Sequence, residues 1–245
     1  MNKNGSDNFK SPYSWSKDKF DSEVLGLEVA KIESIEKSSK IFSLLQELRS
    51  NKIEYATYRV LANNFEMIHN LERNDFILVD GLISLIREGL GEDFTTDNSI
   101  DTFKKEERNQ LIRLAGRVFF LNRLYNDPFI PKKKANKFYA KWMENSLIGN
   151  IADGVLVFRE NGKVFGFVTV KKDGHIPLLG VSEEKRGRGI AKRLVRGAVN
   201  RLCEWNLNKA YIETQMSNIA ALHVYKDLGF KIINSYLTFA WHNND

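Results

Sequence analysis

The chain has 245 residues, 42% of them hydrophobic, and a formal net charge of +6, and this length predicts one or two domains with a sizeable core. Its single cysteine, Cys203, excludes disulfide and zinc frameworks. Because residues 1–10 lack a signal-peptide core and no apolar run approaches the roughly 20 residues of a membrane helix, we expect a cytoplasmic protein without a membrane span.

The first region predicts a small α/β domain at residues 20–93. Residues 1–19 before it are polar and serine-rich without a period, and we expect a flexible N-terminus there. Strand-like and helix-like stretches then alternate as β-α-β-α-β, which favours a mixed sheet packed by two helices. The expected role of this domain is structural: support, homodimerisation or one wall of a substrate cleft. Its predicted strands are 24–35, 53–61 and 76–86, and its predicted helices are 39–49 and a short one capped by Asn63 or Asn64.

A polar stretch rich in Asp, Thr and Ser, at 91–101, predicts the boundary to a second domain at residues 94–245. This domain opens with a predicted long helix over 103–124, which the prolines of 125–134 must end. No internal repeat of solenoid length is apparent. The later predicted elements are a helix at 135–148, strands at 154–159 and 163–170 joined by the hairpin signal Asn161-Gly162, a turn at Asp173-Gly174, a strand ending at 181, a helix at 190–206, a strand at 209–214, a helix at 218–228 and a strand at 231–241.

Residues 185–191, Lys-Arg-Gly-Arg-Gly-Ile-Ala, connect a strand to a helix. A strand that turns through glycines into a helix N-terminus presents several backbone N–H groups without partners, at the positive end of the helix dipole. Glycines let a phosphate approach the backbone, and Arg186 and Arg188 add positive charge. The loop therefore predicts a site for an anionic, phosphate-bearing ligand.

Two common phosphate-loop patterns do not fit this loop. The Walker pattern is absent from the chain, and the dinucleotide pattern needs glycine or alanine where Lys192 stands. The pattern Arg/Gln-x-x-Gly-x-Gly/Ala does fit, through Arg186, Gly189 and Ala191. In this it resembles the coenzyme A loop of the GCN5-related N-acetyltransferases (GNAT). The alternative is a plain glycine turn before a surface helix.

A second motif lies about thirty residues further on. Asn218, Ala221, Tyr225, Gly229 and Phe230 match the superfamily pattern Asn-x-x-Ala-x-x-x-Tyr-x-x-x-Gly-Phe at every defined position. The local physics agrees, because asparagine is a good N-cap and glycine suits a left-handed helix C-terminus. The alternative makes Tyr225 an ordinary core aromatic on an apolar helix face.

The resemblance implies an α/β (α+β mixed sheet) fold, in which a GNAT acyltransferase core follows a small βαβαβ domain. It also implies acetyl-CoA as co-substrate and no metal. The pyrophosphate is expected on the amides of 187–191, and the pantetheine arm is expected to pair like an extra strand with 179–181. The implied cofactor-binding residues are Leu179, Gly180, Val181, Arg186, Gly187, Arg188, Gly189, Ile190, Ala191, Asn218 and Tyr225.

The resemblance further implies a direct attack by the acceptor amine, with Tyr225 protonating the departing thiolate as general acid. The pairing is reasonable because phenol and thiol have reference pKa values of about 10 and about 8.5. Asn218 would orient the coenzyme arm or a bound water. His175 and Glu213 are candidate bases, although a structural role is the default for each, and bulk solvent is the third option.

For the acceptor, residues 122–145, 214–222 and 235–241 resemble the dTDP-fucosamine acetyltransferases, and residues 20–26 resemble them more loosely. This branch of the superfamily acetylates the 4-amino group of dTDP-4-amino-4,6-dideoxygalactose. The resemblance thus implies a nucleotide-sugar partner and surface-polysaccharide biosynthesis, such as that of lipopolysaccharide O-antigen or enterobacterial common antigen. The fuller Arg-Gly-Arg-Gly loop leans toward the generic superfamily form. The implied substrate-binding residues are Arg123, Tyr125, Tyr139, Trp142 and Gln215, with helix core as the alternative for Tyr139 and Trp142.

Three other functions stay open. An acetyltransferase for protein N-termini, lysines or another small amine uses the same loop and tyrosine. A non-catalytic coenzyme A sensor is disfavoured by the intact Tyr225. A nucleic-acid partner is not expected, because the charges are scattered and the run 132–134 follows a proline in a predicted loop.

Overall fold

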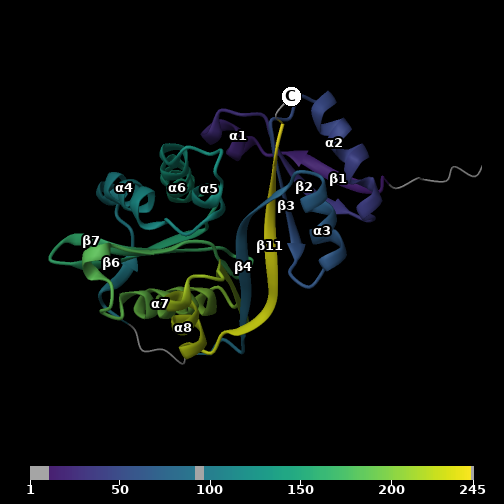
Figure 1. Ribbon diagram of the computed structural model, residues 1–245. Helices are drawn as coiled ribbons and strands as arrows, with labels where there is room; N and C mark the ends of the chain where they lie inside the picture. The colour runs from purple at the N-terminus through teal and green to yellow at the C-terminus, as the bar shows by residue number, and fades with distance from the viewer. Residues whose placement is uncertain (1–10, 92–96, 244–245) are drawn as a thin grey trace, which may run out of the picture. The chain divides into compact units, whose positions relative to one another are not determined.

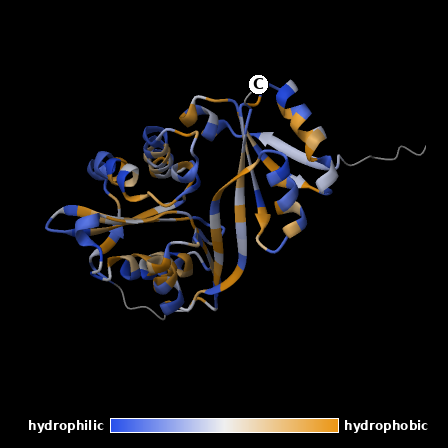
Figure 2. Cartoon of the chain, in the orientation of Figure 1, coloured by the Kyte–Doolittle hydropathy of each residue, from blue (hydrophilic) through white to orange (hydrophobic). Residues whose placement is uncertain are grey.

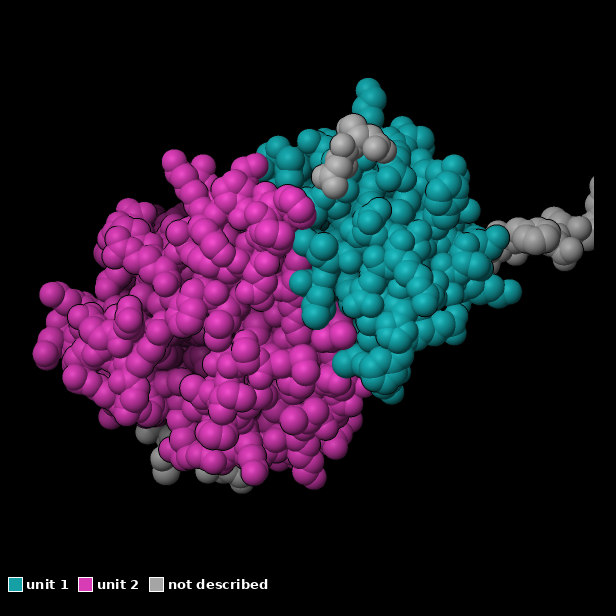
Figure 3. All heavy atoms as spheres, in the orientation of Figure 1, with its two compact units in different colours: residues 1–78, 238–245 teal, residues 79–237 magenta. Residues whose placement is uncertain are grey.

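The computed structural model describes residues 11–91 and 97–243, and the chain divides into two compact units (Figure 3). Unit 1 comprises residues 1–78 and 238–245, and unit 2 comprises residues 79–237. The strands β4 (Ile77–Glu88) and β11 (Lys231–His242) each pass from one unit into the other. The mixed α/β class is confirmed, whereas the predicted division into domains 20–93 and 94–245 stays a prediction.

Unit 1 contains a sheet with the strand order β1-β2-β3-β11. The strand β1 runs antiparallel to β2, and β2 runs parallel to β3. The predicted β-α-β-α-β order is found as β2-α2-β3-α3-β4. The elements of this unit are β1 (Tyr13–Lys17), α1 (Lys19–Leu25), β2 (Val29–Ile35), α2 (Ile41–Ser50), β3 (Tyr55–Leu61) and α3 (Phe65–Arg73).

Two predictions for the N-terminal region are corrected. Residues 1–10 lie outside the described residues, but residues 13–17 form β1 rather than a flexible tail. The predicted strand 24–35 begins only at Val29, because a helix precedes it. The Asp18 side chain accepts the Asp21 amide at 2.9 Å and caps this helix, which ends at Gly26 in a left-handed conformation.

Unit 2 follows the predicted helix and strand order with three differences: a short strand is added before its first helix, the predicted long helix is two helices, and the strand before the glycine loop is split in two. Its sheets have the orders β11-β4-β10-β8 and β5-β6-β7-β9. Within the described residues, no helix combines the length and apolarity that a membrane crossing requires. The elements are β5 (Ile100–Thr102), α4 (Arg108–Val118), α5 (Arg123–Asn126), α6 (Lys132–Leu147), β6 (Gly154–Glu160), β7 (Lys163–Val170), β8 (His175–Ile176), β9 (Leu179–Val181), α7 (Ile190–Glu204), β10 (Lys209–Gln215) and α8 (Ile219–Asp227).

The predicted long helix over 103–124 is wrong: it is two helices. The helix α4 ends where Phe119 takes an extended conformation. The side chain of Asn122 then accepts the amides of Leu124 and Tyr125 and starts α5. The lysine run 132–134 is likewise not a loop but the first turn of α6, because Pro131 fits the position before a helix.

Two hydrophobic cores cover opposite faces of the β6–β7 sheet (Figures 1 and 2). On one face, α4 and α6 pack over Val155, Val157 and Phe167. On the other face, α7 and α8 pack over Leu156, Val168 and neighbouring residues, and this core includes Tyr225. Side chains therefore alternate between the two cores along each strand, as the pleat of a sheet requires.

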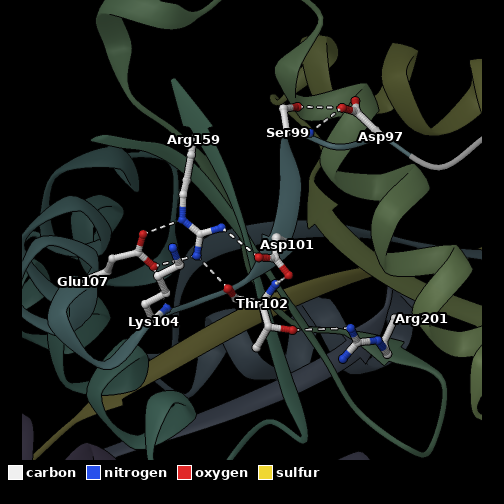
Figure 4. A network of polar contacts seen from close by, with 8 residues as sticks. All are labelled: Asp97, Ser99, Asp101, Thr102, Lys104, Glu107, Arg159 and Arg201. Carbon is white, nitrogen blue, oxygen red and sulfur yellow. Dashed lines mark hydrogen bonds and ion pairs between the residues drawn. The ribbon is translucent and has the colours of Figure 1, made fainter. Parts of the chain in front are cut away.

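A polar network fastens β5 and the start of α4 to β6 (Figure 4). The Arg159 guanidinium donates to Glu107 at 2.5 Å and 2.9 Å and to the Thr102 carbonyl at 2.6 Å. Burial opposes the charged form of Glu107, yet the bonds from Arg159 and the Lys104 amide outweigh it and lower the pKa of Glu107. This network therefore holds the start of α4 next to β5 and β6.

Candidate active site

The strand that leads into the glycine loop is split in two. The strand β8 pairs in parallel with β10, whereas β9 pairs antiparallel with β7. Pro177 stands between them and lacks the N–H that a continuous ladder would need. The chain thus leaves one sheet and joins the other, and β9 becomes the last strand of its sheet.

The free edge of β9 exposes backbone hydrogen-bonding groups. The Leu178 carbonyl accepts from the Thr169 amide at 2.9 Å, and the Ser182 amide donates to the Phe165 carbonyl at 2.7 Å. Because alternate residues of an antiparallel strand point their groups to the same side, the N–H and C=O of Leu179 and Val181 point away from β7. An extended ligand can therefore pair with β9 as a further strand would.

The loop after β9 opens the N-terminus of α7. Gly187 and Gly189 have φ angles of +74° and +73°, a region that glycine adopts without strain. Gly189 is the N-cap, and no side chain caps the helix. Among residues 11–91 and 97–243, no backbone acceptor is found for the amides of residues 187–189. With the first amides of α7, they form a row of donors for an anion.

Arg186 is held against the end of α4. Its Nε donates to the Val181 carbonyl at 3.4 Å and its Nη2 to the Val118 carbonyl at 3.5 Å. The guanidinium also lies over the Phe120 ring, 5.3 Å from its centre. Arg186 therefore connects the loop to the segment between α4 and α5, an orientation that the loop motif did not predict.

Two glycines let helices approach the sheet beside the loop. A Cβ on Gly166 of β7 would lie 2.9 Å from Leu194 and 3.3 Å from Ile190 of α7. A Cβ on Gly180 of β9 would lie 2.6 Å from Phe167 and 2.9 Å from Val118 of α4. Gly166 was not among the predicted site residues, although a glycine inside a strand is a signal for such close approach.

The second motif forms α8 as predicted. The Asn218 side chain accepts the Ala221 amide at 3.3 Å and donates to Thr214 Oγ1 at 3.2 Å, so it holds α8 against β10. Tyr225 is only 4% exposed and packs 6.0 Å from the Phe230 ring. Burial raises the pKa of the Tyr225 phenol. No partner for its hydroxyl is found within the described ranges 11–91 and 97–243.

The candidate bases lie on the opposite face of β10 from the α7 core. His175 is exposed, and its Nδ1 lies 3.0 Å from Asp173 Oδ1. It pairs in register with Tyr211 near the start of β10 and stacks on that ring. Glu213 accepts from Ser84 of β4 at 3.2 Å. His175 is therefore the first residue of β8, held by the preceding turn, and Pro177 and β9 separate it in sequence from the glycine loop.

The predicted acceptor residues lie on α5, α6 and the end of β10. Tyr139 stacks in parallel on Trp142, with ring centres 6.1 Å apart, and on Phe119 at 4.4 Å. Phe119 falls within the long helix predicted over 103–124, but it lies just after the end of α4. Arg123 lies over the Phe138 ring, and Gln215 Nε2 donates to Asp80 at 3.5 Å. Tyr125 donates to Asn136 of α6. These residues thus divide into an aromatic stack and a separate polar contact on β10.

Comparison with known proteins decides the family. The model of the acetyltransferase (GNAT) family matches residues 118–230, the segment that holds both motifs. This segment of the chain belongs to the GNAT family of acetyltransferases. This acetyltransferase is 26% identical over 179 residues to dTDP-fucosamine acetyltransferase of Escherichia coli O6:H1, covering 71% of this chain and 75% of that protein.

One further relative and one solved structure are also similar to this chain. It is 27% identical to an N-alpha-acetyltransferase of Saccharolobus solfataricus over 160 residues, or 61% of this chain and 87% of that one. The crystal structure of a GCN5-related N-acetyltransferase from Sphaerobacter thermophilus matches with a TM-score of 0.60 at 12% identity, covering 94% of this chain and 76% of that chain. That likeness establishes the shared fold.

The site also fits the coenzyme of the family. The free edge of β9 and the uncapped start of α7 offer the hydrogen-bond donors that a pantetheine arm and a diphosphate require. No cluster of three or more metal-binding side chains occurs in the described part of the chain.

Proposed function

We propose that the protein is an acetyl-CoA-dependent N-acetyltransferase for the 4-amino group of a nucleotide-linked aminodeoxysugar, of the dTDP-4-amino-4,6-dideoxygalactose type, in surface-polysaccharide biosynthesis. The proposed acceptor rests on the similarity to dTDP-fucosamine acetyltransferase, which extends over 75% of that protein. The geometry supports the coenzyme half of the proposal independently.

The chain holds the coenzyme with backbone groups. The amides of residues 187–191 receive the diphosphate, and Arg188 adds charge at the same loop. The outward-facing groups of Leu179 and Val181 pair with the pantetheine arm, leaving a β9 N–H to stabilise negative charge that develops on the thioester oxygen. When bound, acetyl-CoA supplies the acetyl thioester, and the chain aligns it with the amine.

Tyr225 acts as the general acid. Its hydroxyl is held by the core around α8 and stays protonated, because burial raises its pKa. It can therefore donate a proton to the thiolate that leaves as the amide bond forms. Asn218 acts through position: its cap of α8 and its bond to Thr214 fix the helix that carries Tyr225.

The acceptor amine must lose a proton, and His175 is assigned no part in this step. It is committed to Asp173 and Tyr211, and its register position lies at the start of β10. Because electron-withdrawing oxygens make a sugar amine less basic than lysine, water suffices as the proton acceptor. Glu213, near the end of β10, stays the alternative base.

The nucleotide sugar is proposed to contact the stack of Tyr139 and Trp142, the α5 residues Arg123 and Tyr125, and Gln215. Stacked rings with half-buried faces suit a planar base or a sugar face. Arg123 supplies a cation on the same helix pair, suited to a diphosphate. The role of the N-terminal βαβαβ segment in dimerisation stays a prediction.

A protein N-terminus is the second candidate acceptor, because an archaeal N-alpha-acetyltransferase aligns over 87% of its own length. The experiment gives the purified chain acetyl-CoA with dTDP-4-amino-4,6-dideoxygalactose, with its 4-epimer, and with peptides bearing free N-termini. We expect the sugar nucleotides to be acetylated with a kcat/KM at least roughly a hundredfold above the peptides. Acetylation of peptides alone would contradict the acceptor and leave the enzyme class intact.

The variant Trp142→Ala refines this test. Removing one ring of the stack should raise KM for the sugar nucleotide about tenfold, since a ring contact contributes about 0.5–1.5 kcal/mol. The KM for acetyl-CoA should stay the same. An unchanged sugar KM would exclude the stack from the acceptor site.

A further inference from the structure

Two segments of the chain have the same element bounds. Adding 154 to the residue numbers of β3, α3 and β4 gives the bounds of β10, α8 and β11 at both ends of every element. The first set is Tyr55–Leu61, Phe65–Arg73 and Ile77–Glu88, and the second is Lys209–Gln215, Ile219–Asp227 and Lys231–His242. Similar lengths are common in α/β proteins, but a single offset for six boundaries calls for a closer comparison.

The hydrogen bonds around the two helices also repeat. The side chains of Asn64 and Asn218 accept the amide three residues later, at 3.2 Å and 3.3 Å. Their own amides donate to the last residue of the preceding strand, at 3.0 Å and 2.9 Å. At the other end, the amides of Phe76 and Phe230 reach back five residues, at 3.1 Å and 3.0 Å.

The side chains at equivalent positions play equivalent parts. Asp75 and Gly229 precede the phenylalanines, and both have left-handed φ angles, +62° and +79°. Phe76 and Phe230 are both buried. Ala56 and Ala210 are the same buried residue in the two strands, and His69 and His223 share a helix position.

The preceding strand pairs follow the same register. In unit 1, Ile32 of β2 pairs in parallel with Tyr58, and in unit 2, Ile176 of β8 pairs in parallel with Ile212. Tyr58 and Ile212 are related by the same 154 residues. The crossover between them is ten residues longer in unit 2, where α7 (Ile190–Glu204) replaces the shorter α2 (Ile41–Ser50).

The earlier copy lacks each feature that serves the coenzyme. The strand β2 is continuous, whereas β8 and β9 are split. Residues 36–40, Glu-Lys-Ser-Ser-Lys, contain no glycine where the later copy has its Gly187 and Gly189 loop. The position of Tyr225 is taken by Leu71, which is fully buried. The packing residues and the asparagine cap are thus retained, whereas the split strand, the glycine loop and the tyrosine are absent.

The last strand of each copy lies beside a strand of the other copy. The strand β4 follows α3 but pairs antiparallel with β10 over Leu82–Glu88. The strand β11 follows α8 and ends beside β3 in the order β1-β2-β3-β11. The earlier copy therefore supplies the strand next to β10, which carries Gln215 and leads to Asn218.

We infer that residues 29–88 are a second, non-catalytic copy of the coenzyme-binding half 175–242, that the two copies exchange their last strands, and that the chain holds one acetyl-CoA. The inference of a repeat does not depend on the proposed function, whereas the count of one coenzyme rests on the proposed function. The N-terminal copy serves the reaction by completing the sheet that carries β10.

A segment transplant tests the repeat. Residues 64–76 take the sequence of 218–230 except at the buried positions Met67, Ile68 and Leu71 of α3, which stay as they are. We expect a single cooperative unfolding transition, a Tm within about 10 °C of the parent, and acetyl-CoA binding within about threefold, because caps and exit turn are equivalent. The control carries the same new residues in scrambled order and should lose cooperative unfolding. A transplant that unfolds like the scrambled control would overturn the repeat.

Isothermal titration with acetyl-CoA tests the coenzyme count on the full chain. We expect one molecule per chain, with binding weakened in Gly189→Ala and unchanged in Lys37→Ala, which alters the equivalent loop of the first copy. Two molecules per chain would overturn the loss of function in that copy. Absence of all binding would contradict the coenzyme count and the proposed function, while the transplant would still decide the repeat by its thermal readout.

Discussion

Tyr225 combines two properties that a general acid needs: a protonated hydroxyl and a fixed position. The core of α8 provides the second through Leu228 and Phe230, which pack in the same cluster. The first follows from burial, which raises the pKa of the phenol and keeps the proton in place at neutral pH.

Replacing Tyr225 with Phe tests this assignment. The ring packing is kept, so Tm should change little. The kcat should fall roughly a hundredfold, which is the lower end of the rate enhancement that a general acid contributes. Because a group with a raised pKa stays protonated below that pKa, the parent rate should show no loss from Tyr225 ionisation up to about pH 10. The measurement is a pH profile of kcat for both proteins, and an unchanged kcat in Tyr225→Phe would remove the acid role.

Gly189 matters for its backbone conformation rather than for packing. An added Cβ would meet nothing within 4 Å, but the φ angle is +73°. Gly189→Ala should destabilise the loop that presents the backbone N–H donors by about 1–2 kcal/mol. We therefore expect the KM for acetyl-CoA to rise about tenfold. Gly162→Ala is the matched control, since Gly162 has a φ of +74° and equally open surroundings in the β6–β7 hairpin. Equal KM effects in both variants would contradict the loop assignment.

Asp97 gives a prediction for stability against pH. Its carboxylate accepts from Arg193 of α7 at 2.6 Å and from Ser99 (the latter contact is drawn in Figure 4), and these bonds hold the pKa of Asp97 well below its usual range. A lowered folded pKa means that the stabilisation is complete above the unfolded value of 3.8 and is lost as pH falls below it. Asp97→Asn should therefore lower Tm at pH 7, and the Tm difference between variant and parent should shrink as the pH falls below 4. A constant Tm difference across this range would contradict the ion pair.

At the scale of elements, the chemistry depends on how closely α7 approaches β7. Gly166→Ala places a Cβ 2.9 Å from Leu194 and should displace the start of α7, costing about 1–3 kcal/mol. We expect a lower Tm together with a raised KM for acetyl-CoA. Gly197→Ala is the control, because it crowds Ile100 at 2.7 Å further along the same helix and should lower Tm without changing that KM. Similar KM values for the two variants would exclude this positioning role.

The sequence predicted the elements whose signals are local. The Asn64 and Asn218 caps, the Asn161-Gly162 hairpin and the glycine corner all arise from one residue's conformation or short side chain, and all are found. The break at Phe119 escaped prediction because its apolar period continues through the break. The contact of Arg186 with Phe120 depends on residues far apart in sequence, which no local pattern reports.

The exchange of β4 and β11 bears on the behaviour of the whole molecule. Each unit contains a strand that continues from the other unit's chain segment, so neither sheet is complete without both segments. The repeat was missed in the sequence because few residues are identical at the 154-residue spacing, and the likeness lies in element bounds and hydrogen bonds.

We therefore expect the two units to unfold together. Differential scanning calorimetry should give one transition whose van't Hoff and calorimetric enthalpies agree. Two resolved transitions, with one moved upward by acetyl-CoA and the other unaffected, would contradict the exchange as a source of cooperativity.

We propose that the glycine loop after β9 binds a diphosphate and directs the thioester toward Tyr225. A crystal structure with bound acetyl-CoA would show both contacts. We expect diphosphate oxygens at about 2.7–3.2 Å from the amides of residues 187–191 and the coenzyme sulfur beside the Tyr225 hydroxyl. A coenzyme bound elsewhere, or a diphosphate held by side chains alone, would contradict it.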